Sequence, residues 1–303
     1  MSFAGEVKEE LLNIEKTACC EQSEARGLLL FGRELSPSSV SFLTENGSVA
    51  SAFANAVHLF SGHTPETQVS ASGNYKIVIE NRNINDALLS EVLPDGLNSK
   101  KQLTVGEIER DCCKASFIRG AFLAGGTVTN PDTEYHLEFS CPSKTLANDL
   151  MELIRQLGIE PKTAKRAGNN IVYIKKSGDI EDILSAMGAT ETSMMLMGAK
   201  MYKDVRNTIN RRVNFENANI ARSVEAAMRQ YEAIELIEKK QGLDSLPAEL
   251  KRAAALRLEN PDVSTGEIRK LLGEELSLSG LNHRFKKLID MAQELKKDDD
   301  KRK

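Results

Sequence analysis

The chain lacks tryptophan, has few other aromatic residues, and has no apolar run long enough to cross a membrane. Aromatic residues make up 5% of the 303 residues, so a large aromatic cage around a ligand is not expected. No apolar stretch approaches the ~20 residues that span a bilayer. The first residues, MSFAGEVKEELL, carry acids where a signal peptide has a basic end and an apolar run. We therefore expect a cytoplasmic protein.

Several motifs that indicate small-molecule chemistry are also missing. The glycine-rich patterns GxxxxGK[ST] and GxGxxG, which cradle phosphates, do not occur. Histidine is scarce, and the spacing of the four histidines is not that of a metal site. We expect no cofactor, no small-molecule substrate and no membrane partner.

The net charge of −4 conceals an acidic front and a basic back. Residues 1–199 contain 18 Lys and Arg against 26 Asp and Glu, a balance of −8. Residues 200–303 contain 22 against 18, a balance of +4. A polyanionic partner is therefore expected to meet the second part of the chain.

A repeated motif divides the front part into two similar segments. CCEQSEARGLLLFG begins at Cys19, and CCKASFIRGAFLAG begins at Cys112, 93 residues later. Each motif precedes a strand, a helix, a glycine-flanked strand and a short helix by periodicity. The expected elements are residues 40–44, 48–60, 75–80 and 84–92, then 135–140, 144–157, 170–176 and 180–187. We predict two α+β repeats, at about 19–95 and 112–190, within a domain of residues 1–198.

The repeat also pairs the cysteines, because Cys19–Cys20 and Cys112–Cys113 occupy matching positions. In a cytoplasmic protein they should be reduced thiols. Pseudo-symmetry could bring all four together as a zinc site. Zinc ligands are usually spaced C-x2-C or wider, however, because adjacent side chains diverge. We therefore predict no bound metal and a packing role for these cysteines.

The last third of the chain is predicted to be entirely helical. We assign residues 199–245 to a helical linker, ended by Gly242 and Pro247. A bundle of three helices should follow within residues 246–303. The second of these helices begins at a capping box formed by Ser264 and Glu267, and Ser279 should cap the third.

The third helix has an apolar face opposite a face rich in hydrogen-bond donors. A recognition helix presents such donors to the major groove, where Asn reads adenine and Arg or Lys reads guanine or phosphate. An ordinary solvated basic face is the alternative. We predict a helix-turn-helix motif at about residues 264–297. The expected contacts to double-stranded DNA are Ser264, Thr265, Arg269, Lys270, Ser277, Ser279, Gly280, Asn282, His283, Arg284, Lys286 and Lys287.

A second basic segment, residues 200–229, precedes this domain. We also assign Arg211 and Arg212 to DNA, as contacts that touch phosphates without reading sequence. Salt bridges to the acidic front domain are an equally open interpretation.

The segment IRGAFLAGG, residues 118–126, resembles the signature of the LAGLIDADG homing endonucleases. In that family two such helices pack side by side, and the acid before each final glycine holds the metal ions that cut DNA. The resemblance places those acids at Gly32 and Gly125, neither of which has a carboxylate. Metal-assisted cleavage needs anionic oxygen ligands there. We therefore predict no catalytic residue and no enzymatic activity.

Nearly the whole chain resembles the WhiA family, sporulation and cell-division regulators of Gram-positive bacteria. The segments that carry the resemblance are MSFAGEVKEEL, the two cysteine pairs, FIRGAFLAGGTVTNPDTEYHLEF, VRNTINRRVNFENANI and SLSGLNHRFKKL. The resemblance implies a degenerate homing-endonuclease-like domain joined to a helix-turn-helix. It also implies sequence-specific DNA binding and roles in cell division, the cell cycle and chromosome segregation.

We therefore predict an α+β protein in which two pseudo-symmetric LAGLIDADG-like repeats precede an all-α helix-turn-helix domain. The predicted function is non-catalytic regulation of transcription at the nucleoid, during cell division and sporulation-type development, with other regulatory proteins as candidate partners. One alternative is an active endonuclease that uses other acids, such as Glu34 or Asp132. Another is a scaffold whose helical domain binds a protein.

Overall fold

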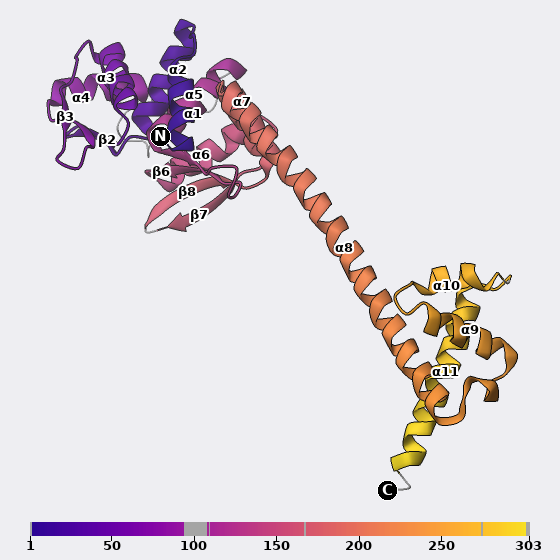
Figure 1. The fold of residues 1–303 in the computed structure, drawn as a ribbon. Coiled ribbons are helices and arrows are strands. Elements are labelled where there is room, and N and C mark those ends of the chain that lie inside the picture. The colour runs from indigo at the N-terminus through magenta and orange to yellow at the C-terminus, as the bar shows by residue number, and fades with distance from the viewer. Residues whose placement is uncertain (1, 94–107, 109, 167, 274, 301–303) are drawn as a thin grey trace. The chain divides into compact units, whose positions relative to one another are not determined.

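The computed structural model describes residues 2–93, 108, 110–166, 168–273 and 275–300. The chain divides into two units, Met1–Asp204 and Val205–Lys303 (Figure 1). The predicted end of the first repeat, near residue 95, lies outside the described residues, as do the last three residues of the predicted helix-turn-helix domain. The exact domain boundaries at residues 198 and 245 stay a prediction. No helix of the described ranges is long and apolar enough to cross a membrane.

The first unit contains the same run of elements twice. The first run consists of α2 (Ala18–Leu30), β1 (Glu34–Leu35), β2 (Val40–Thr44), α3 (Gly47–Ser61), β3 (Thr67–Val69), β4 (Tyr75–Ile79) and α4 (Arg82–Val92). The second consists of α5 (Asp111–Gly125), β5 (Gly126–Val128), β6 (Leu137–Cys141), α6 (Lys144–Arg155), β7 (Lys162–Arg166), β8 (Asn169–Ile174) and α7 (Ser177–Met187). Both sheets are antiparallel, with the orders β1-β2-β4-β3 and β5-β6-β8-β7. The predicted α+β class and the duplication are confirmed.

The central strands form because their apolar residues alternate. In β6, Leu137, Phe139 and Cys141 are buried while the residues between them are not, and Phe139 pairs with Val172 of β8. Burying one face of the sheet under helices stabilises it by the hydrophobic effect. The helices after the central strands begin at side-chain caps, Asn46 for α3 and Ser143 for α6.

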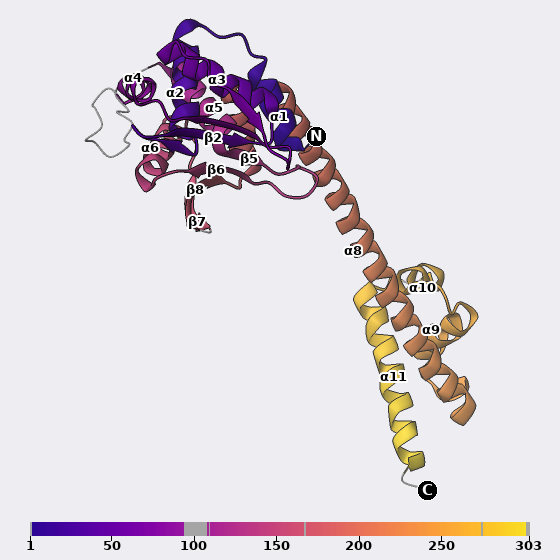
Figure 2. The same ribbon diagram turned by 90° about the vertical axis from the view of Figure 1, so that its left-hand side faces the viewer.

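The helices α2 and α5 cross at two glycines that occupy matching positions of the repeats. A Cβ atom at Gly27 would lie 2.3 Å from the carbonyl oxygen of Phe117, and one at Gly120 would lie 2.1 Å from that of Glu24. Each glycine thus admits the backbone of the other helix. Both views show the two helices side by side (Figure 2). Because glycine carries no side chain, the two backbones can approach closely at this crossing.

An N-terminal helix, α1 (Phe3–Leu12), which the sequence patterns did not predict, packs Val7 and Leu11 into the same core. Its Glu10 side chain accepts hydrogen bonds from the backbone N–H groups of Glu191, at 2.6 Å, and Thr192, at 3.0 Å. These groups open α8 (Thr190–Gln241). A carboxylate there satisfies free N–H groups and complements the helix dipole. The start of the chain therefore caps the long helix.

The second unit is built from the last part of α8 and three shorter helices. These are α9 (Ala248–Glu259), α10 (Thr265–Leu272) and α11 (Leu278–Asp300), preceded by a single 3-10 turn at Leu243–Ser245. Gly242 ends α8 with a φ of 75°, a conformation that suits glycine. The core of this unit includes Ile234, Ile237, Ala253, Ala254, Ile268, Leu272, Leu281, Phe285, Leu288 and Ala292. The predicted bundle of three helices after α8 is confirmed.

Candidate nucleic-acid interface

Both ends of α10 are fixed by local interactions. Ser264 and Glu267 form the predicted capping box: the Ser264 hydroxyl accepts from the Glu267 N–H, and the Glu267 carboxylate accepts from the Ser264 N–H at 2.8 Å. The hydrogen bonds that this carboxylate accepts from the Ser264 N–H and from the Ser264 hydroxyl lower the pKa of Glu267. Gly273 then ends α10 in the left-handed conformation, with a φ of 63°. The second helix of the motif is therefore short and sharply bounded.

The third helix begins earlier than the sequence predicts. Its first residue is Leu278, and the Gly280 N–H donates to the Ser277 hydroxyl at 3.1 Å. The prediction that Ser279 caps this helix is wrong. Ser277 is the better cap because it lies three residues before Gly280, the usual spacing for a side-chain cap. Ser279 instead lies exposed in the first turn.

Four of the predicted donors share the exposed surface of α11. Asn282, His283, Lys286 and Lys287 are all exposed. The opposite side of the helix is firmly packed, since Leu281, Phe285 and Leu288 are at most 1% exposed. The helix is thus held by its apolar face and presents amide, imidazole and ammonium groups from its first turns.

The other predicted residues of this domain lie in different settings. Arg269 and Lys270 are exposed on α10, and Thr265 is half-buried. Arg284 is turned toward the bundle: its side chain is 14% exposed, and Nη2 lies 3.7 Å from Glu249 of α9. Gly280 lies against the side chain of Leu276. The structure therefore gives Arg284 an intramolecular anionic neighbour that sequence analysis did not foresee.

Sequence analysis missed Arg257, a fully buried arginine that organises the domain. Its guanidinium donates to Gln230 Oε1 at 3.0 Å and to the Val263 carbonyl at 2.6 Å, and it packs over the Phe285 ring. Burial lowers its pKa. It therefore links α8, the turn before α10, and α11. A basic residue on an amphipathic helix is ordinarily expected to be exposed, so no pattern marked it.

The second basic segment is engaged partly within the chain. Arg212 pairs with Glu216 on the same helix at 2.9 Å, and both side chains are exposed. Arg211 is exposed nearby. Two lysines earlier on α8 contact the first unit: Lys200 pairs with Glu181, and Lys203 donates to the Pro131 carbonyl. The interpretation of this segment as salt bridges to the front domain thus applies to Lys200, whereas Lys203 makes a hydrogen bond to a backbone carbonyl.

Of the two positions that correspond to endonuclease acids, Gly125 is blocked by backbone and Gly32 is tightly surrounded. A Cβ at Gly125 would lie 2.8 Å from the Ser140 carbonyl oxygen. A Cβ at Gly32 would lie 3.2 Å from the Leu29 carbonyl oxygen and 3.3 Å from the Phe53 ring. A carboxylate could be added at Gly125 only after the backbone moves. The local packing at the C-terminal end of α5 therefore disfavours an acidic residue at Gly125.

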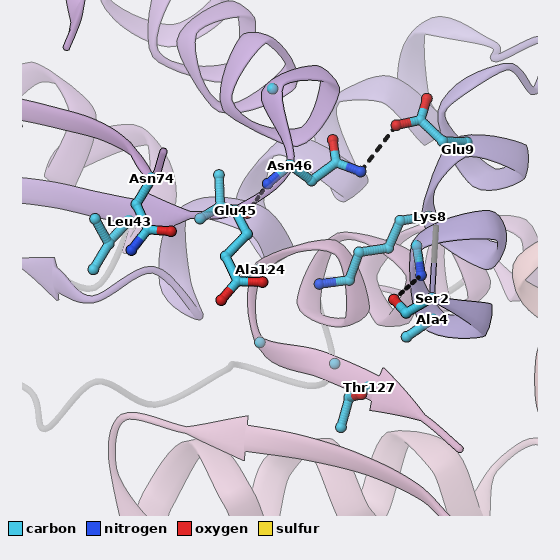
Figure 3. A pocket seen from close by; sticks show the side chains of 15 residues that line it. Ser2, Ala4, Lys8, Glu9, Leu43, Glu45, Asn46, Asn74, Ala124 and Thr127 are labelled. Carbon is cyan, nitrogen blue, oxygen red and sulfur yellow. Dashed lines mark hydrogen bonds between the residues drawn. The ribbon is translucent and has the colours of Figure 1, made fainter. Parts of the chain in front are cut away.

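A pocket adjoins Gly125, and Lys8 of α1 projects into it (Figure 3). Burial lowers the pKa of Lys8 to about 8, and the charge of Glu45 opposes this effect. Figure 3 shows these two side chains pointing toward one another, while Asn46 donates to Glu9 at 2.9 Å. An ammonium group therefore lies in the pocket that Gly125 lines.

The alternative acids proposed from sequence do not line this pocket. Glu34 lies in β1 beside Arg33, and Asp132 lies in a turn where its N–H donates to Asn130. Within the described part of the chain, the one group of three or more candidate metal-ligating side chains consists of the four paired cysteines. These acids are therefore not gathered into a metal clamp of the kind that phosphodiester cleavage uses.

The duplicated sheets, the paired central helices and the following helical bundle define a LAGLIDADG-like α/β domain joined to a helix-turn-helix domain. Comparison with known families agrees. Residues 114–206 match the WhiA LAGLIDADG-like domain, and residues 209–292 match the WhiA C-terminal HTH domain. The chain therefore belongs to the WhiA family, as its motifs predicted.

Individual relatives match from end to end. The probable cell division protein WhiA of Ruminiclostridium cellulolyticum is 34% identical, covering 98% of this chain and 99% of its own. The protein of the same name from Bacillus mycoides is also 34% identical, covering 98% of each chain. The crystal structure of full-length DUF199/WhiA from Thermatoga maritima aligns with a TM-score of 0.61 and 27% identity, covering 97% of this chain and 99% of that chain.

Proposed function

We propose that this protein is a non-catalytic, sequence-specific DNA-binding regulator of transcription that acts on the nucleoid in cell division, chromosome segregation and related developmental programmes. The observation that carries the proposal is the exposed donor surface of α11, formed by Asn282, His283, Lys286 and Lys287 on a helix with a fully packed opposite face. Such a surface has the groups that recognise base edges and phosphates in the major groove.

The names of the relatives support the biological setting. Both curated relatives are described as probable cell division proteins. The match to an HTH domain supports double-stranded DNA as the partner. We also propose regulatory proteins as partners, which would bind to α9 or to the exposed parts of α8.

A binding experiment with a matched control tests the proposal. Fragments of the source genome that the full-length protein retains at physiological salt would be identified, and affinity measured for these and for random DNA. Replacing Asn282 and His283 with Ala should cost ~1–3 kcal/mol per lost base contact on the selected DNA and little on random DNA. Gln293→Ala is the control, because Gln293 is exposed on the same face eleven residues later. Equal losses on both DNAs would contradict base reading.

A cleavage assay tests the non-catalytic part of the proposal. With Mg²⁺ or Mn²⁺ the purified protein should leave the selected DNA intact, because Gly32 and Gly125 supply no ligands. Metal-dependent cleavage that disappears in Glu34→Gln or Asp132→Asn would revive the endonuclease. Cleavage that depends on neither acid and recurs in independent preparations would also contradict the non-catalytic proposal.

A further inference from the structure

The two cysteine pairs meet at one end of the central helix pair. Cys19 and Cys20 are the second and third residues of α2, and Cys112 and Cys113 are the second and third residues of α5. Their four sulfur atoms all lie within 4.8 Å of one another. None of the four is buried, and Cys112 is exposed. Cys113 packs against the core of the first unit, so the packing role predicted from sequence stays a prediction for these residues, whereas Cys141 is buried.

The spacing of the sulfurs suits a single metal ion. A tetrahedral zinc ion with Zn–S bonds of about 2.3 Å has sulfur–sulfur edges of about 3.8 Å. The adjacent Cys112 and Cys113 sulfurs are 3.9 Å apart. The expectation that vicinal cysteines diverge thus does not hold here. Edges of at most 4.8 Å need small rotamer changes to close around one ion, whereas a polynuclear cluster would hold the sulfurs farther apart.

The backbones that carry the two pairs are tied together across the repeat interface. The Ser23 hydroxyl donates to the Cys113 carbonyl at 2.7 Å, and the Cys20 thiol contacts the Cys112 carbonyl at 3.7 Å. Below this point the glycine crossing holds α2 against α5. The cluster is therefore held by the packed core, and closing it around an ion requires no domain movement.

The helix ends favour thiolates at this cluster, although burial raises the pKa of the Cys113 thiol to about 12. Both pairs lie in the first turn of a helix, where the positive end of the helix dipole stabilises negative charge. Four sulfur ligands without nitrogen or oxygen select a thiophilic ion. Exposure of Cys112 gives the ion a path of entry.

We propose that Cys19, Cys20, Cys112 and Cys113 bind one zinc ion that clamps together the N-terminal ends of α2 and α5. Binding releases the thiol protons to solvent and replaces them with four Zn–S bonds, with no change of oxidation state. The ion is structural, because all four coordination positions are filled by protein. It would stabilise the association of the two repeats independently of DNA binding.

The test uses the full-length protein, purified under reducing conditions without chelator. Native mass spectrometry and elemental analysis should find about one zinc ion per chain, and X-ray absorption should find a shell of sulfur at about 2.3 Å. The quadruple variant with Ser at all four positions should contain none. Cys141→Ala is the control and should keep its zinc, because that cysteine lies outside the cluster.

A second measurement tests whether the zinc ion stabilises the fold. A strong chelator should lower the Tm of the native protein and added Zn²⁺ should restore it, whereas the Tm of the quadruple variant should respond to neither. Four free thiols with no uptake of added Zn²⁺ would overturn the proposal. So would a mass lower by one or two pairs of hydrogens, which indicates disulfides, or iron with inorganic sulfide, which indicates a cluster. Zinc retained by the quadruple variant would place the ion elsewhere.

Discussion

The Nε atom of Arg119 lies 2.6 Å from Oε2 of Glu24, so a buried ion pair joins the two repeats of the first unit. Both side chains are less than a tenth exposed. The Arg119 guanidinium also donates to the Met187 carbonyl and the Ser116 hydroxyl. Lys16 is a second cationic partner for Glu24 at 2.7 Å. These hydrogen bonds and ion pairs therefore provide partners for the charged groups of Glu24 and Arg119 at the interface between the repeats.

Glu24→Gln should lower the free energy of unfolding by about 3 kcal/mol, because it leaves the buried Arg119 without its counter-charge. Chemical denaturation at neutral pH measures the change. Glu216→Gln is the control: Glu216 pairs with Arg212 on the surface, and its loss should cost less than about 1 kcal/mol. Equal effects of the two variants would show that burial does not determine the strength of the Arg119 pair.

Gly120→Ala should destabilise the protein by at least about 2 kcal/mol, because the new methyl group collides with the backbone of α2. Gly198→Ala is the matched variant. Gly198 also lies within a helix but has open space around it, so its replacement should stabilise the protein by up to about 1 kcal/mol. The two melting curves should therefore shift in opposite directions, and parallel shifts would contradict the close helix crossing.

Lys8 should make stability depend on pH between about 8 and about 10.4. Burial lowers its pKa to about 8 in the folded protein, whereas an unfolded lysine titrates near 10.4. The unfolded chain binds more protons in this window, so stability should rise with pH through it. Below pH 8 the ammonium group is charged in both the folded and the unfolded protein, so burying the charged group lowers the stability of the fold by its full amount.

Lys8→Met should accordingly stabilise the protein at pH 7 and flatten this rise. Denaturation in urea at several pH values between 7 and 10 measures both effects. The exposed Lys76, replaced in the same way, should leave the pH dependence unchanged. A Lys8 variant that is less stable at pH 7 would mean that the ammonium group is stabilised by its surroundings.

Lys286 and Lys287 should each neutralise a DNA phosphate if the donor surface of α11 meets DNA. Replacing both with Gln should reduce the slope of log affinity against log salt by about 2, since each phosphate contact contributes about 0.9. Lys296 and Lys297, exposed farther along the same helix, provide a control with the same change of charge. An identical loss of slope in both pairs would indicate a diffuse charge effect instead of a docked surface.

Periodicity predicted the elements that have a buried face. The bounds of β2 agree with the prediction at both ends, and α3, α6, β4 and β8 agree to within about two residues, because each alternates or repeats its apolar residues toward the core. The edge strands β3 and β7 escaped prediction for the same reason. All of their residues are exposed, so pairing with a neighbouring strand, which no single sequence displays, determines their conformation.

The sequence predicted which helix face carries the hydrogen-bond donors, but it did not predict every side-chain contact at the candidate sites. The amphipathic pattern identified the donor surface around Asn282, because burial of Phe285 fixes the orientation of the helix. The pattern could not reveal that Arg284 faces Glu249 or that Arg257 is buried, since both depend on neighbours distant in sequence. The meeting of the cysteine pairs likewise depends on the angle at which α2 crosses α5.

The crossing of Gly27 and Gly120 has a consequence for how the two copies of the repeat can diverge. Each glycine makes room for the backbone of the opposite copy, so the need for glycine at each position comes from the other copy. Side chains at the crossing have diverged nevertheless: Glu24 occupies the position that corresponds to Phe117, and it is their backbone carbonyls that face the opposite glycines. In a duplicated domain of this kind the two halves therefore evolve together. A substitution at the crossing position of one half is tolerated only if the backbone of the other half leaves room for it.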